Sequence, residues 1–70
     1  MPKFLIAFDI PTKEKLFKKK IYQILKKTGA KMTQRSLWES ENLNELLNIA
    51  ILIKNIGGKV YVFEAKVLFS

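Results

Sequence analysis

A lone aspartate ends the most apolar stretch of the chain. Asp9 follows the apolar residues 4–8 and precedes Ile10 and Pro11, in a sequence whose formal net charge is +7. A carboxylate beside a buried strand is costly unless it is paired, hydrogen-bonded or bound to a metal ion. Three roles are open for it: capping the next helix, pairing with a lysine, or binding Mg²⁺, which needs few protein carboxylates.

Positive charge is concentrated in one segment. Residues 13–35 hold nine positive charges and one negative charge, whereas the remaining residues hold four and five. The alternatives are a solvated helix face and a phosphate-binding surface, and this clustering favours the second. Lysine contacts predict binding to the nucleic-acid backbone with little base discrimination. The expected nucleic-acid-binding residues are Lys13, Lys15, Lys18, Lys19, Lys31 and Arg35.

Composition excludes several kinds of site. The sequence has no cysteine and no histidine, which excludes disulfides, the usual zinc sites and histidine acid–base catalysis. Ser36 has no histidine to activate it as a nucleophile. The pair at residues 57–58 is interpreted as a helix stop, because no Walker-type or dinucleotide-binding pattern surrounds these glycines.

The order of predicted elements is strand, helix, strand, helix, strand. Strand 3–10 precedes a helix over 13–28 that Thr12 is expected to cap, and residues 31–39 are expected to form one kinked strand because no glycine or proline divides them. Asn42 is expected to cap the second helix, and residues 59–69 form a last extended segment with a bend near its end. The order predicts an α+β protein, a two-layer α/β sandwich with both helices on one face of the sheet.

Both faces of the predicted sheet are apolar. The helices cover one face, and the more hydrophobic second helix is expected to be the more deeply buried. Its predicted apolar stripe is Leu43, Leu46, Leu47, Ala50 and Ile53, and the uncovered sheet face is expected to hold Leu5, Ala7 and some of Leu37, Tyr61 and Phe63. Two copies stacked sheet to sheet would bury that face, and packing is favoured over base stacking for Trp38 and Phe63.

The chain is expected to form a single domain over residues 1–70. A chain this short buries a small core, so association of copies is expected to stabilise it. No apolar run is long enough to span a bilayer and no signal peptide is visible, so we expect a cytoplasmic protein without membrane partners.

Two motifs give the chain a family resemblance. Phe8-Asp9-Ile10-Pro11 closes the first strand, and Gln34-Arg35-Ser36-Leu37-Trp38-Glu39 follows the basic helix. Together they resemble the Cas2 family of CRISPR-associated proteins, within the VapD-like superfamily, over residues 3 to about 64. Phe8 stands where the family commonly has tyrosine, and Met32 where arginine is frequent.

The resemblance implies a ferredoxin-like fold and a sheet-to-sheet homodimer with Asp9 of each subunit near the dyad. It implies a nucleic-acid-binding protein of CRISPR spacer acquisition, a step in antiviral defence, that holds duplex DNA by its phosphate backbone beside a Cas1-type integrase. DNA is favoured over RNA. One alternative is a magnesium-dependent endonuclease or endoribonuclease, including a VapD-like toxin ribonuclease, with Asp9 as catalytic and metal-binding residue. The other is an orphan interaction module whose lysines only solubilise it.

Overall fold

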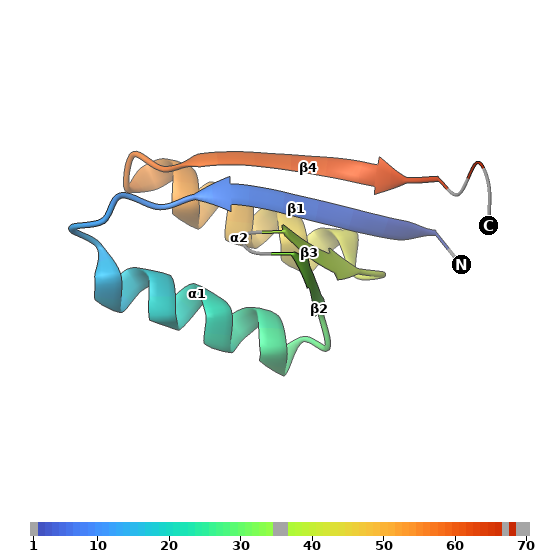
Figure 1. Ribbon diagram of the computed structural model, residues 1–70, viewed down its shortest axis with the longest axis horizontal. Helices are drawn as coiled ribbons and strands as arrows, with labels where there is room; N and C mark the ends of the chain where they lie inside the picture. Colours follow the sequence, from blue (N-terminus) through green and yellow to red (C-terminus); the bar gives the residue numbers. More distant parts are fainter. Residues whose placement is uncertain (1, 35–36, 67, 69–70) are drawn as a thin grey trace.

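The protein is a small α+β domain built on an antiparallel sheet. The computed structural model describes residues 2–34, 37–66 and 68, which contain two helices and four strands. The sheet order is β2-β3-β1-β4, and all three pairings are antiparallel (Figure 1). This architecture is compatible with the expected ferredoxin-like fold. The elements are β1 (Lys3–Asp9), α1 (Lys15–Lys27), β2 (Lys31–Gln34), β3 (Leu37–Ser40), α2 (Leu43–Asn55) and β4 (Lys59–Ala65).

Both helices pack on the same face of the sheet, as predicted. Side chains alternate along a strand, and in β1 Ile6 and Phe8 are buried while Leu5 and Ala7 remain partly accessible. The buried strand residues form one core with residues of both helices. That core consists of Ile6, Phe8, Ile10, Ala30 and Trp38 with Ile21 and Leu25 of α1 and Leu46, Ile49 and Ile53 of α2.

The prediction of one kinked strand over residues 31–39 was wrong, because the structure has two strands there. β2 and β3 pair antiparallel with Met32 opposite Trp38, on either side of residues 35–36, which lie outside the described residues. β2 lies at the sheet edge, and all four of its residues are exposed. The strand character of both segments was predicted, but no glycine or proline lies between them to signal the turn that divides them.

The predicted start of the first helix was also wrong. The helix begins at Lys15, with Glu14 rather than Thr12 at its N-cap position and without a side-chain cap. The amide of Glu14 instead donates to the carbonyl oxygen of Pro11 at 2.9 Å, which makes a turn of the residues before the helix. The predicted stops are confirmed, since Gly29 and Gly57 adopt φ angles of +86° and +85° that favour glycine.

The second helix begins as predicted, but its rotation differs from the prediction. Leu46 and Ile53 are buried, yet Leu47, which the sequence placed in the same stripe, is exposed together with Ile51 and Leu52. A helix packed on one sheet face buries only one side of its surface, so the additional apolar residues of α2 lie on the outside.

The last expected strand is only partly described. β4 ends at Ala65, Lys66 has no regular structure and Leu68 lies in a bend. The other residues of the expected final strand, 67 and 69–70, lie outside the described residues. Neither helix in the described part of the chain has the length and apolarity that crossing a membrane requires.

The cap at Asn42 gives a direct test of the local structure. Asn42 Oδ1 accepts a hydrogen bond from the Glu45 amide at 3.2 Å, and the Asn42 amide donates to Ser40 Oγ at 3.0 Å. Replacing Asn42 with alanine removes the first of these bonds and should lower the free energy of unfolding by about 1 kcal/mol, measured by urea denaturation. Thr12→Ala is the matched control, and it should leave stability unchanged because Thr12 caps no helix.

Candidate nucleic-acid interface

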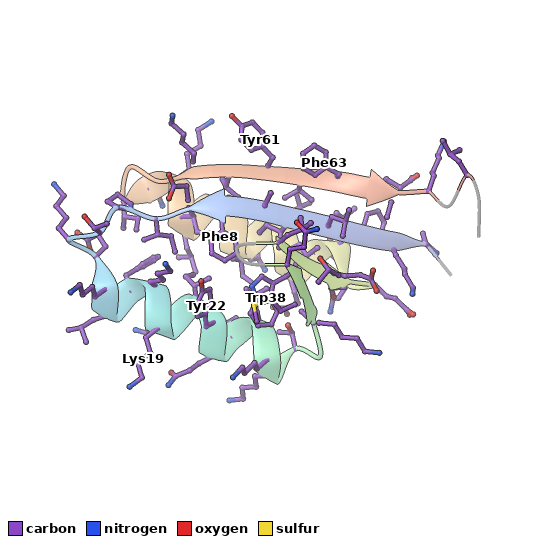
Figure 2. The ribbon with its side chains drawn as sticks, viewed as in Figure 1. Phe8, Lys19, Tyr22, Trp38, Tyr61 and Phe63 are labelled. Carbon is purple, nitrogen blue, oxygen red and sulfur yellow. The ribbon has the colours of Figure 1, made fainter. Side chains whose placement is uncertain are left out.

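The outward side of α1 carries a line of lysines. At about 100° per residue, Lys15, Lys19 and Lys26 lie within about 40° of one another around the helix, about 120° from the mean direction of the buried Ile21 and Leu25. These three lysines, called the lysine stripe below, are exposed, and Figure 2 shows Lys19 pointing away from the sheet. The helix contains no acidic residue, so the stripe has no neutralising carboxylate on its own element.

Lys18 lies at the side of the stripe and contacts an aromatic column. Its Nζ atom is 5.9 Å from the centre of the Tyr22 ring, within the range of a cation–π interaction. Tyr22 in turn lies between Phe8 of β1 and Trp38 of β3, with ring centroids 6.0 and 5.8 Å away. The three rings of Phe8, Tyr22 and Trp38 therefore connect α1 to the sheet. Their contact with Lys18 places its ammonium group at the edge of the helix layer.

This surface includes one lysine outside the helix and one lysine of the stripe that was not predicted. Lys13 is exposed in the turn before α1, one residue from the Glu14 N-cap. Lys26 was not among the predicted binding residues, although its spacing from Lys15 and Lys19 places it in the same line. Helical periodicity alone was a sufficient signal for Lys26. The structure thus groups Lys13, Lys15, Lys18, Lys19 and Lys26 on or beside α1.

Lys31 lies away from this group, in a neighbourhood of mixed charge. It starts β2 and stands opposite Glu39 of β3. The Glu39 carboxylate also accepts an ion pair from Lys3, with Nζ 3.4 Å from Oε1. A cavity of about 290 Å³ opens at this place, and its lining residues are Lys3, Thr28, Gly29, Lys31, Glu39, Ser40, Glu41 and Asn42. Two lysines face two glutamates there, so the cavity adds no net positive charge to the α1 surface. The predicted contact Arg35 lies outside the described residues.

Asp9 ends β1 on the side of the sheet that the helices leave uncovered. Its side chain is exposed, and its partner across the strand pair is Lys59 of β4. The helix-capping role is excluded because α1 begins at Lys15, with Glu14 at its N-cap. A Cβ atom on Gly58 would lie 3.0 Å from the Asp9 carbonyl oxygen, so only glycine lets the chain after α2 approach this end of β1 without strain.

The described residues offer a metal ion few ligands near Asp9. No group of three or more histidine, cysteine, aspartate or glutamate residues that could hold a metal lies among them. The described part of one chain therefore brings at most two such side chains together here. That donor set suits Mg²⁺, which keeps several waters, and it becomes stronger if a second copy brings its own Asp9.

The uncovered side of the sheet is an apolar surface. Tyr61 and Phe63 are 60% and 49% exposed, and their rings are nearly parallel with centroids 6.3 Å apart. Figure 2 shows both rings pointing away from α1 and its lysines. The register places Leu5 beside Phe63, and Ala7 between Tyr61 and Leu37. We call this surface the open sheet face; its residues are Leu5, Ala7, Leu37, Tyr61 and Phe63.

Comparison with known proteins adds no assignment. No family model matches the chain, and no curated protein sequence matches it. The likeness to the Cas2 family therefore depends on the two sequence motifs and on a fold that is compatible with them.

Proposed function

We propose that the protein is a Cas2-like homodimer that binds duplex nucleic acid, DNA in preference to RNA, by its phosphate backbone. The observation that carries the proposal is the separation of two surfaces on one small domain. The exposed lysine stripe lies on the helix layer, and the apolar open sheet face lies on the opposite side. One surface suits a polyanion and the other suits a second copy of the chain.

The case for the dimer is energetic. Phe and Tyr side chains bury ~150–250 Å² when fully covered, so covering the exposed halves of Tyr61 and Phe63 is worth about 2–3 kcal/mol for each ring. Four such rings in a dimer give on the order of 10 kcal/mol, comparable with the ~4–15 kcal/mol of freedom lost on association. Leu5, Ala7 and Leu37 add the surplus that makes pairing favourable.

The case for backbone binding is the chemistry of the cations. Lysine ammonium groups act as point charges toward phosphates and carry little geometric information about bases. Sheet-to-sheet pairing leaves α1 of each copy on the outside, so a dimer presents two lysine stripes. The family resemblance extends the proposal to the cytoplasm, to spacer acquisition and to a Cas1-type integrase partner, with Lys31 and Arg35 as further contacts.

A second function is favoured by the position of Asp9. Its exposed carboxylate lies on the same side of the sheet as the proposed dimer contact, so pairing of two sheets can bring in a second carboxylate. In this alternative the two Asp9 side chains hold Mg²⁺, which would supply an activated water and neutralise the leaving oxygen of a phosphodiester. The protein would then be a magnesium-dependent endonuclease or endoribonuclease, the VapD-like toxin ribonuclease included.

The dimer contact can be tested by charging its centre. Phe63→Lys places like charges within the open sheet face of both copies and should convert the dimer into monomers, because two unpaired ammonium groups cannot be buried together. Sedimentation velocity gives the mass of each species. Leu16→Lys, at an 85% exposed position of α1, is the matched control and should remain dimeric. A wild-type chain that sediments as a monomer would refute the proposed pairing.

The lysine surface can be tested by its response to salt. If about six phosphates are neutralised per dimer, the logarithm of the duplex affinity falls with the logarithm of salt concentration with a slope near −5. The joint replacement of Lys15, Lys18 and Lys19 by glutamine should weaken binding at least tenfold and make that slope shallower, because fewer phosphates are then neutralised. Fluorescence anisotropy with labelled duplexes at several salt concentrations measures both quantities.

The control for this experiment removes the same charge elsewhere. The joint replacement of Lys3, Lys54 and Lys66 by glutamine removes no lysine from α1 and should change the affinity by less than the first variant does. Equal losses in the two variants would show that only net charge matters. Wild-type protein without salt-sensitive binding to DNA or RNA would instead support the interaction module.

The catalytic alternative predicts a magnesium requirement that depends on one residue. Asp9→Asn keeps the shape of the side chain but removes the anionic metal ligand, so it should abolish Mg²⁺-dependent cleavage of labelled DNA and RNA. Glu64→Gln, an exposed carboxylate of β4 that faces the other side of the sheet, is the control and should cleave normally. An Asp9→Asn protein as active as its parent would reject the enzyme.

A further inference from the structure

The outward side of α2 carries no charged residue. Six exposed positions spaced by three and four residues lie on one side of this helix, opposite the buried Leu46, Ile49 and Ile53. Glu45 and Lys54 lie at its two flanks. We call this surface the α2 outer face; its residues are Asn44, Leu47, Asn48, Ile51, Leu52 and Asn55.

This face contrasts with the other helix of the same layer. α1 has the same length of thirteen residues, and its exposed side is dominated by lysines. On α2 the exposed side chains of Leu47, Ile51 and Leu52 are 43%, 60% and 44% accessible. Apolar surface without charge is the composition found at the centre of protein interfaces. The α2 outer face is therefore a candidate contact surface, separate from the open sheet face.

Its side chains suit a second copy of the same chain. A carboxamide both donates and accepts hydrogen bonds, so asparagine can pair with its own copy, whereas lysine or glutamate facing its copy is repelled. A contact between identical surfaces also requires a pattern that matches itself after a half-turn. About a point between residues 49 and 50, two of the three pairs match in type: Asn44 faces Asn55 and Leu47 faces Leu52, whereas Asn48 faces Ile51 beside the dyad.

We propose that the α2 outer face is a second homotypic contact, in which α2 of one copy packs antiparallel against α2 of another. The distribution of charge limits where two copies of the protein can meet. Each copy carries a formal +7, and the lysines of α1 make other contacts on the helix layer repulsive. The α2 outer face is the part of that layer where two copies meet without opposing like charges.

The contact is expected to be weak on its own. A helix of thirteen residues is ~20 Å long, and one helix side buries well below the ~800 Å² per partner of a standard stable interface. It faces away from the open sheet face, so both contacts can form at once. If the sheet dimer of the proposed function exists, the α2 contact would link such dimers into larger assemblies.

The absence of cysteine from the sequence makes the contact easy to test by cross-linking. Asn48→Cys places a thiol beside the expected dyad, where two cysteines on facing helices can form a disulfide. Under mild oxidation this variant should form a covalent dimer at least ten times faster than the control Leu16→Cys on α1. Adding Ile51→Lys to the Asn48→Cys chain should return its rate to that of the control.

A mixing experiment guards against a variant that fails to fold. Asn48→Lys and Asn48→Asp each keep all the apolar residues, and each alone should associate more weakly than the wild type in sedimentation at high concentration. Mixed one to one they should associate again, because opposite charges then meet across the contact. Equal rates for the two cysteine variants, or no recovery on mixing, would overturn the proposal.

The two contacts can be told apart in the same assay. Phe63→Lys added to the Asn48→Cys chain should remove the sheet dimer and leave the cross-link intact. Loss of the cross-link would mean that the Asn48→Cys disulfide forms only through the sheet contact. That result would reject the α2 contact and leave the sheet dimer unaffected. Retention of the cross-link in a chain that otherwise sediments as a monomer would support the α2 contact even if the proposed sheet pairing fails.

Discussion

Two helices can cover only one side of this sheet, and the strands are apolar on both sides. In β1, Ile6 and Phe8 face the helices, while Leu5 and Ala7 face the other way. β4 repeats this pattern, with Tyr61 and Phe63 on the uncovered side. The core buries the side chains that face the helices within one chain. The set that faces the other way has no covering element among the described residues, and this uncovered surface is the basis of the proposed sheet-to-sheet pairing.

The elements that the sequence predicted correctly are those specified by local signals. Alternation of side chains marks β1 and β4, the Asn42 side chain caps α2, and positive φ angles require glycine at residues 29 and 57. The strand character of residues 31–39 was predicted, but the division into β2 and β3 was missed because no glycine or proline marks a turn between them. Thr12 was predicted to cap the first helix, but a turn from Pro11 to Glu14 precedes that helix instead.

The candidate site shows the same division between local and tertiary information. The lysine stripe follows from helical spacing, so the sequence predicted Lys15 and Lys19 and contained the signal for Lys26. The surroundings of Lys31 depend on strand register, which puts Glu39 opposite it. The exposure of Leu47 depends on how α2 is rotated against the sheet. Neither register nor rotation can be obtained from one sequence by periodicity alone.

In the proposed function, separation of charge from apolar surface would let one small chain pair with a second copy and bind a polyanion on different surfaces. The lysine stripe lies on the far side of a helix layer ~10 Å thick, so stripes of two sheet-paired copies lie farther apart than the ~8 Å Debye length at physiological salt. Their repulsion therefore costs the proposed dimer little. Bound phosphates would neutralise the remaining positive charge of the two stripes. Binding of nucleic acid and pairing of copies would therefore reinforce each other, because they use different surfaces.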